Sequence, residues 1–162
     1  MITSYLKNIK LFSELSSEEL DIIDKTLREV NYEAGDVIFE EDSAGNELFL
    51  LFDGQVCISK KTSFIDHEID VNKTLIKLDA KDYSFFGEVG LLGKQLRTAT
   101  AKAITNCKLY SINHDSFVKI IKEYPHIGVV VLWEISQKLA QILEKNDSDI
   151  LKLTTALIYA LR

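Results

Sequence analysis

Glycines interrupt the first half of the chain at nearly regular intervals, and this pattern constrains the fold more than any other feature. Short apolar runs lie between the breaks EAGD, DSAGNE and FDGQ, which contain Gly35, Gly45 and Gly54. The glycines are ten and nine residues apart, a spacing typical of the short strands of a roll, sandwich or barrel. Glycine at a strand break usually supplies a positive φ angle or a bulge. The pattern predicts β structure, and we expect these glycines to serve the fold rather than contact a ligand.

A helical segment precedes this region and further strands follow it. In LSSEELDIIDKTLREV, Ser16 and Glu19 have the spacing of a capping box, and the apolar residues after them repeat with helical period. Beyond the glycine breaks, the runs TLIKLDA, TATAKAI and CKLYSI predict strands, with a turn at Asn106 between the last two. The polar run TSFIDHEIDVNK is interpreted as a loop or irregular hairpin.

Helical periodicity returns near residue 115. DSFVKIIKEY predicts a helix that Asp115 or the Asn113–His114 pair caps and that Pro125 ends. Two more helices are expected after it, HIGVVVLWEISQKLAQILEKN and then DSDILKLTTALIYALR, the second opened by Asp147 or Ser148. This order of elements predicts an α+β fold.

The expected architecture is a β-roll, jelly-roll-like, flanked by an N-terminal helix and C-terminal helices. The chain has 162 residues, of which 46% are hydrophobic, enough for a single domain with a buried core. We expect one domain over residues 1–162, with a helical part at 1–29, the roll at 30–114 and the C-terminal helices at 115–162.

Charge and composition argue against several classes of protein. The net charge is -6 and no Lys/Arg run exceeds the pair at residues 60–61, so no nucleic-acid partner is expected. No segment approaches the roughly 20 apolar residues of a membrane helix, and the N-terminus lacks the features of a signal peptide. Cys57 and Cys107 lie in apolar, strand-like runs, which favours core packing and a reducing, cytoplasmic location. No metal-ligand cluster, cofactor motif or catalytic motif is present, so no metal, no cofactor and no enzyme activity are expected.

The stretch FGEVGLLGKQLRTAT combines one acid, Glu88, with one cation, Arg97, nine positions later. An arginine presents a planar fork of N–H donors that matches the oxygens of a phosphate. If residues 88–92 form a short helix, the backbone N–H groups near Gly87 and Gly90 lie at its N-terminus, where an anion is favoured. A carboxylate beside a phosphate makes sense if it accepts a hydrogen bond from a ligand hydroxyl. A sugar 2'-hydroxyl next to a phosphodiester has this pairing.

The same stretch resembles the phosphate-binding cassette of the cyclic-nucleotide-binding domain family, which includes the catabolite activator protein and the regulatory subunits of cyclic-AMP-dependent protein kinase. FGEVGLLGKQLRTATAKA matches the family's Phe-Gly-Glu, its short apolar helix and its Arg followed by small residues. LFSELSSEEL, YEAGDVIFEEDSAGNELFLLFDGQV and INHDSFVKIIKEYP resemble the opening helix, the first strands and the closing strand with its helix. The resemblance therefore covers most of the chain.

The resemblance implies a roll that binds cyclic AMP or cyclic GMP. It assigns the phosphate to Arg97 and the ribose 2'-hydroxyl to Glu88, with backbone N–H groups near Gly87 to Gly90 around the phosphate. A long helix after the roll would move in to cap the base, and this movement would be the signal. Within the cassette, residues 86–100, the predicted ligand-binding residues are Phe86, Gly87, Glu88, Val89, Gly90, Arg97, Thr98 and Ala99, and the base-capping positions fall near Ile142 and Leu143.

Two positions depart from the family pattern. Lys81 stands where the turn before the cassette usually has glycine, and the turn is about two residues longer; Leu96 stands where proline is common. Neither change removes a ligand group, but the geometry of the turn is left open. Thr98 is compatible with adenine or guanine, and we favour cyclic AMP.

Three alternatives remain open from the sequence. Arg97 and Glu88 are a buried structural ion pair, or the domain is an interaction module without a ligand, or the cassette binds another small anion. About twenty residues follow the expected capping helix, and a helix-turn-helix would need more chain and a basic recognition helix. We therefore expect no DNA binding, so the output would be a partner protein or a homodimer. The last helix has Ile150, Leu153, Leu157 and Leu161 on one face, a surface either for a second copy or partner or for packing on its own domain.

Overall fold

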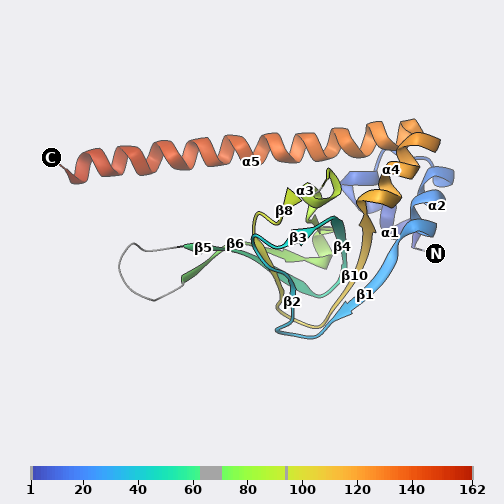
Figure 1. Ribbon diagram of the computed structural model, residues 1–162, viewed down its shortest axis with the longest axis horizontal. Coiled ribbons are helices and arrows are strands. Elements are labelled where there is room, and N and C mark those ends of the chain that lie inside the picture. Colours follow the sequence, from blue (N-terminus) through green and yellow to red (C-terminus); the bar gives the residue numbers. More distant parts are fainter. Residues whose placement is uncertain (1, 63–70, 94, 162) are drawn as a thin grey trace.

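The computed structural model describes residues 2–62, 71–93 and 95–161 (Figure 1). Three helical segments precede the roll, two short ones lie within it, and two helices follow it. In order they are α1 (Thr3–Asn8), η1 (Lys10–Phe12), α2 (Ser17–Thr26), η2 (Ala80–Asp82), α3 (Glu88–Leu91), α4 (His114–Glu123) and α5 (Pro125–Ala160). The strands are β1 (Arg28–Tyr32), β2 (Val37–Phe39), β3 (Ala44–Gly45), β4 (Glu47–Asp53), β5 (Gln55–Thr62), β6 (Val71–Asp79), β7 (Phe85–Phe86), β8 (Gln95–Leu96), β9 (Thr100–Ala103) and β10 (Cys107–Asn113).

The strands form two antiparallel sheets of four in the described part of the chain. One has the order β1-β10-β4-β7 and the other β2-β9-β5-β6, while β3 pairs with β8. The expected α+β fold, a β-roll with helices on either side of it in the chain, is confirmed. The run TSFIDHEIDVNK contributes Thr62 to β5 and its last three residues to β6; residues 63–70 of it lie outside the described residues.

Strand β4 shows how the roll and the helices share one sheet. Its sequence, ELFLLFD, is a continuous apolar run rather than an alternating one. Leu48 and Leu50 belong to the core shared with the helices, whereas Phe49 and Leu51 belong to the core inside the roll. A strand buried on both faces needs apolar residues at every position. The sheet therefore lies between the helices and the roll interior.

The helix starts expected from the sequence are confirmed at two places. The Glu19 N–H donates to Ser16 Oγ at 3.3 Å and the Ser16 N–H donates to Glu19 Oε2 at 2.9 Å, which is a complete capping box. At α4 the cap is Asn113, whose Oδ1 accepts the Ser116 N–H at 2.8 Å. Of the two alternatives for this helix, Asp115 is therefore not the cap.

The prediction of two separate helices after Pro125 is wrong, because residues 125–160 form one helix, α5, of 36 residues. Pro125 occupies its first turn, where the missing N–H costs nothing. Asp147 and Ser148 are residue types that often cap helices, but they start a helix only where the preceding chain is not helical. Here Gln141 to Asn146 are already helical, and no glycine or proline follows to break the helix.

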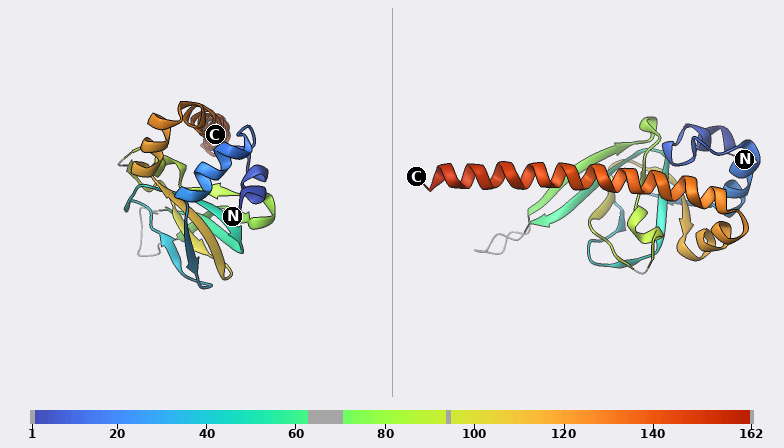
Figure 2. Two further views of the ribbon diagram at one scale, coloured as in Figure 1. Left: turned by 90° about the vertical axis from the view of Figure 1, so that its right-hand side faces the viewer. Right: turned by 90° about the horizontal axis from the view of Figure 1, so that it is seen from above.

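Helix α5 crosses the roll and projects beyond it (Figures 1 and 2). Its first half packs on the domain through the buried residues Ile127, Gly128, Val131 and Ile135. From Ala140 to Leu161 every residue is exposed. The alternative in which the Ile150, Leu153, Leu157 and Leu161 face packs on its own domain is therefore wrong. No helix in the described part of the chain is long and apolar enough to cross a membrane.

Candidate ligand-binding site

The short helix expected after Phe86 is present as α3. Gly87 precedes it with φ of 77°, a left-handed conformation that glycine adopts without strain. Beyond its last residue, the Leu92 N–H donates to the Val89 carbonyl at 3.2 Å, and the Leu91 carbonyl is 2.8 Å from Nδ1 of His114. The start of α4 therefore holds the end of α3.

Arg97 lies inside the roll rather than on its surface, with 6% of its area exposed. Its backbone is held by two bonds to the loop before β3, from Arg97 N–H to the Ser43 carbonyl at 2.9 Å and from Asp42 N–H to the Arg97 carbonyl at 2.8 Å. Its Nη1 donates to the carbonyls of Glu47 and Gly87, at 2.8 and 3.3 Å. The guanidinium is thus joined to α3 and to β4 at once.

Three glycines from two segments leave room for this guanidinium. A Cβ on Gly87 or on Gly90 would lie 2.8 Å from Arg97 Nη1, and one on Gly45 would collide with Arg97 Nε. Real Cβ atoms essentially never approach so closely, so side chains at these positions would displace the arginine. Gly45 does not have the positive φ that a strand break often needs and borders Arg97 instead; its expected role in the fold rather than in ligand contact stays a prediction. Gly35 and Gly54, with φ of 95° and 92°, do have the expected turn role.

The electrostatic state of Arg97 is unusual for a structural arginine. Burial lowers its pKa, while the carboxylates of Glu47 and Glu88 act in the opposite direction. The ring of Phe39 lies under the guanidinium, 4.2 Å from Cζ. Its Nε is buried without a hydrogen-bond partner, and in the described residues no carboxylate forms an ion pair with it. A buried cation with unused donors is suited to an anionic ligand.

Glu88 is not the ion-pair partner of Arg97 in the described structure. Its side chain is 9% exposed, and its Oε2 lies 3.2 Å from Nζ of Lys138 on α5. The same ammonium donates to the Phe85 carbonyl at 2.9 Å. The structural ion pair considered from the sequence is therefore replaced by two separate arrangements, Arg97 with backbone carbonyls and Glu88 with Lys138.

The remaining predicted site residues divide into two groups. Phe86 and Ala99 are buried, and Phe86 stacks on Phe49 with 5.5 Å between ring centroids, so they support the cassette. Thr98 is exposed next to Arg97, and Val89 is half-buried. Both have area open to solvent, and their contact with a ligand stays a prediction.

The expected base-capping residues lie on the exposed part of α5. Ile142 is 42% exposed and Leu143 is 62% exposed. Ile142 follows Lys138 by one helical turn and shares its face of the helix. Because Lys138 contacts the cassette, Ile142 is the better placed of the two, and the capping role of both stays a prediction.

Sequence reasoning missed Gly45, Glu47 and Lys138. Gly45 and Glu47 precede Arg97 by about 50 residues, and Glu47 contributes a backbone carbonyl, which any residue type provides. Lys138 belongs to no motif and follows Arg97 by 41 residues. Its only sequence signal is helical position, four residues before Ile142, and this signal does not distinguish it from other exposed lysines.

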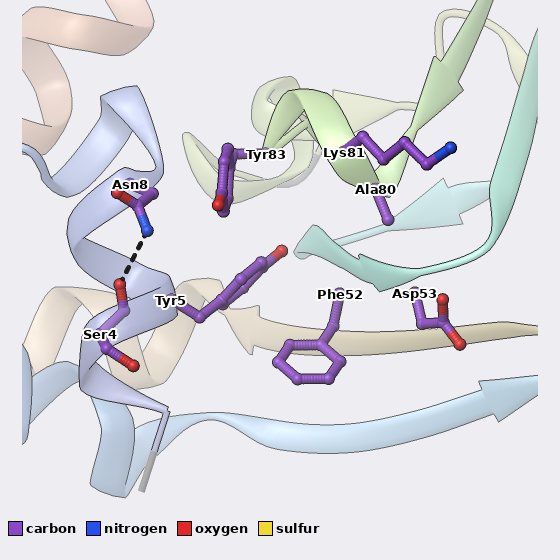
Figure 3. A pocket seen from close by; sticks show the side chains of 8 residues that line it. All are labelled: Ser4, Tyr5, Asn8, Phe52, Asp53, Ala80, Lys81 and Tyr83. Atoms are coloured by element: carbon purple, nitrogen blue, oxygen red, sulfur yellow. Dashed lines mark hydrogen bonds between the residues drawn. The ribbon is translucent and has the colours of Figure 1, made fainter.

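A cavity of about 470 Å³ lies away from the cassette (Figure 3). It lies between α1 and η2, and Tyr5, Phe52 and Tyr83 form its aromatic wall. The turn with Lys81, left open by the sequence, builds one side of it: η2 is followed by Tyr83, a non-glycine residue with φ of 50°. Burial raises the pKa of Tyr5, whose hydroxyl donates to the Leu51 carbonyl at 2.6 Å. No predicted site residue lines this cavity.

Comparison with known proteins decides the family. The family model for the cyclic nucleotide-binding domain matches residues 29–124. The chain belongs to the cyclic nucleotide-binding domain family. The resemblance drawn from the cassette and the strands is thereby confirmed.

Individual relatives agree with this assignment. Potassium/sodium hyperpolarization-activated cyclic nucleotide-gated channel 1 of Homo sapiens is 30% identical over 128 residues, which are 74% of this chain and 13% of the channel. The cAMP-bound PfPKA-R has a TM-score of 0.63 at 34% identity, covering 75% of this chain and 40% of that one. A cyclic nucleotide-binding domain from Methylobacillus flagellatus has a TM-score of 0.76 at 21% identity, covering 93% and 80%, and shows the shared fold. This chain spans only a small part of the channel's length.

Proposed function

We propose that this domain is a regulatory module that binds cyclic AMP in the cassette. Arg97 would receive the phosphate, Glu88 would accept the ribose 2'-hydroxyl, and the N–H groups at Gly87 to Gly90 would surround the phosphate oxygens. The observation that carries the proposal is the buried guanidinium of Arg97, which keeps an unpaired Nε between three glycines and the Phe39 ring. Family membership supports a cyclic nucleotide as the anion.

The preference for cyclic AMP over cyclic GMP rests on one relative. PfPKA-R, at 34% identity, is a cAMP-bound relative. The predicted cap, Ile142 and Leu143, is apolar, and apolar side chains pack on either purine without selecting it. Thr98 is exposed beside Arg97 and is the polar side chain nearest in sequence to the phosphate residue. Cyclic GMP is therefore the second candidate, with Thr98 as the group that would favour it.

A calorimetric titration with cyclic AMP, cyclic GMP and 5'-AMP tests the proposal. We expect micromolar or tighter binding of cyclic AMP and much weaker binding of 5'-AMP, because a doubly charged phosphate is repelled by Glu88. Protein freed of copurified nucleotide by unfolding and refolding is used, with its circular dichroism checked. Binding of none of the three would leave an interaction module without a ligand, and equal binding of 5'-AMP would favour a general anion site.

We further propose that α5 carries the signal to a second copy of this chain. Leu143, Ile150 and Leu157 recur every seven residues, and Asn146 and Leu153 follow three residues after the first two. This is the a/d repeat of a coiled coil, with Leu143, Ile150 and Leu157 at a and one polar residue, Asn146, at d. All five residues are exposed in the single chain, so pairing of two α5 helices would bury them. A different partner protein with an apolar helix is the alternative.

The proposed role is binding rather than catalysis. The described residues hold no group of three His, Cys, Asp or Glu that could hold a metal ion. Cys107 is buried in the core inside the roll, in line with the core packing expected of it, and a reducing, cytoplasmic location stays a proposal from the sequence. No nucleic-acid or membrane partner is proposed.

A further inference from the structure

Lys138 joins the long helix to the residue that the proposed function assigns to the ribose. Its Nζ lies 3.2 Å from Glu88 Oε2, 2.9 Å from the Phe85 carbonyl and 4.1 Å from the centroid of the Phe85 ring. In the described residues these are the hydrogen bonds that α5 makes to the segment 85–100. The ammonium is thus held at one place by an anion, a carbonyl and an aromatic face.

The two carboxylate oxygens of Glu88 have different surroundings. Oε2 is taken by Lys138, while Oε1 makes no hydrogen bond to the described residues. Oε1 is not among the buried unpaired atoms, so it keeps some contact with solvent although the side chain is only 9% exposed. One oxygen of the carboxylate is therefore fixed, and the other remains available to a donor from outside.

The charge of Lys138 also offsets the repulsion between Glu88 and a bound phosphate. A buried carboxylate is costly unless it is paired, and it repels the phosphate that Arg97 would bind. Arg97 does not hydrogen-bond to Glu88, since its Nη1 is bonded to the carbonyls of Glu47 and Gly87. Lys138 is the cation that pairs with Glu88, so its charge offsets the repulsion between this carboxylate and the phosphate.

We propose that Lys138 is a positioning residue for nucleotide binding: it fixes and neutralises Glu88 so that Oε1 accepts the ribose 2'-hydroxyl. This inference rests on the proposed function and extends it, because it places part of the specificity for the ribose on α5. Lys138 does not touch the ligand in this scheme. Its effect passes through Glu88 alone.

Lys138→Met is the decisive variant, because methionine keeps the stem over the Phe85 ring and removes the charge. Titrations compare cyclic AMP with its 2'-deoxy analogue. We expect the affinity for cyclic AMP to fall about tenfold, the effect of losing one partly exposed charge-assisted bond, and the affinity for the 2'-deoxy analogue to fall less. Discrimination between the two ligands should therefore shrink. Lys138→Arg keeps the charge. It should therefore lose less affinity for cyclic AMP, and less discrimination against the 2'-deoxy analogue, than Lys138→Met does.

Two controls separate this role from a structural one. Lys145→Met changes an exposed lysine farther along α5 and should leave both affinities unchanged. In a Glu88→Gln background, Lys138→Met should have little further effect on discrimination, because the two residues act as one unit. A purely structural ion pair would change thermal stability without narrowing the ribose preference.

The outcomes distinguish this inference from the proposed function. If the wild-type protein binds no cyclic nucleotide, the proposed function fails first and this inference fails with it. If the wild type binds and Lys138→Met shows unchanged discrimination, only the positioning role of Lys138 is overturned. Tighter binding by Lys138→Met would also overturn it, since the ammonium would then compete with the ribose hydroxyl instead of positioning its acceptor.

Discussion

At the scale of single residues, Arg97 combines the features that matter most for the proposed site. It is buried, its pKa is lowered by that burial, and it is held by two backbone carbonyls rather than by a carboxylate. A structural arginine in a core normally has its charge matched by a hydrogen-bonded acid, because an unmatched buried charge is costly. In the proposed function, this arrangement costs stability and leaves donors of Arg97 for the anion.

Arg97→Ala tests this role. Removing the fork of donors while leaving a buried phosphate unpaired should cost roughly 2–5 kcal/mol, an affinity loss of about 30-fold to several thousand-fold. Isothermal titration with cyclic AMP measures it, with circular dichroism to confirm the fold. Arg28→Ala, which changes an exposed arginine of β1, is the control and should bind as the wild type does. A loss below threefold for Arg97→Ala would contradict the phosphate role.

Gly45→Ala tests the space around the arginine. A Cβ at this position collides with Arg97 Nε, so the guanidinium must move, and we expect cyclic AMP affinity to fall about tenfold or more as charge-assisted bonds are lost. Gly35→Ala is the matched control, because nothing lies within 4 Å of its Cβ but its φ is 95°. It should cost about 1 kcal/mol in urea unfolding and leave affinity unchanged. If Gly45→Ala lowered stability and left the affinity for cyclic AMP unchanged, Gly45 would serve only the fold.

At the scale of elements, the parts that the sequence predicted are those with local signals. The capping box at Ser16, the asparagine cap at Asn113 and the helix after Gly87 all depend on residues within four positions of one another. Two strand breaks were found because Gly35 and Gly54, which have positive φ, lie in them, and the later strands were found from their apolar runs. The division of α5 was mispredicted because Asp147 and Ser148 favour a helix start locally, whereas the helical residues before them decide the outcome.

The site was predicted only in part for the same reason. Glu88 and Arg97 belong to one short stretch and were found together. Three further groups meet Glu88 or Arg97 only when the roll closes and α5 packs on it: Lys138, Gly45 and the Glu47 carbonyl. These long-range contacts have no signature in the sequence. The structure also separated Glu88 from Arg97, since only packing decides whether an acid and a base in one motif form a pair.

The contact between α2 and α5 yields a prediction about pH. Glu19 Oε1 lies 2.6 Å from His126 Nδ1, and the backbone N–H of Ser16 and then His126 lower the pKa of Glu19 below its usual value of 4.5. Because the folded-state pKa is the lower one, the stabilisation is present above about pH 4.5 and is lost as the pH falls through the folded value.

Glu19→Gln should therefore reduce the free energy of unfolding by about 0.5–1 kcal/mol at pH 6. The difference should vanish near pH 3, where the wild-type carboxyl is neutral as well. Urea unfolding at several pH values measures it. Glu18→Gln changes a neighbouring exposed acid of the same helix turn and should show a smaller effect. A Glu19→Gln difference that persists undiminished at pH 3 would mean that shape, not charge, accounts for it.

At the scale of the whole molecule, the two halves of α5 differ in what they contact. Its first half completes the domain core and carries Lys138, while its second half, from Ala140 onward, has no contact partner burying it in the single chain. Apolar residues exposed along a helix with seven-residue spacing are expected to be covered in solution. A single rigid helix that connects a ligand site to a pairing surface can transmit occupancy without a hinge.

Leu153→Asp tests the pairing of two α5 helices. Leu153 is 71% exposed and lies at a core position of the proposed coiled coil, so a carboxylate there should convert a dimer to a monomer. Light scattering across a concentration series measures the mass. Ser148→Asp adds the same charge at an outward position of the same helix and should remain dimeric. A wild-type protein that is monomeric at about 100 μM would overturn the pairing and favour a different partner protein.

The same variants show whether ligand binding and pairing are coupled through α5. If cyclic AMP strengthens the dimer by some factor, linkage requires that the dimer bind cyclic AMP more tightly than the monomer by the equivalent free energy. Leu153→Asp should then bind cyclic AMP more weakly than Ser148→Asp, although it lies far along α5 from the cassette. Dimer dissociation constants with and without ligand, and ligand affinities of the two variants, give the coupling independently. Equal affinities would mean that α5 pairs but does not carry the signal.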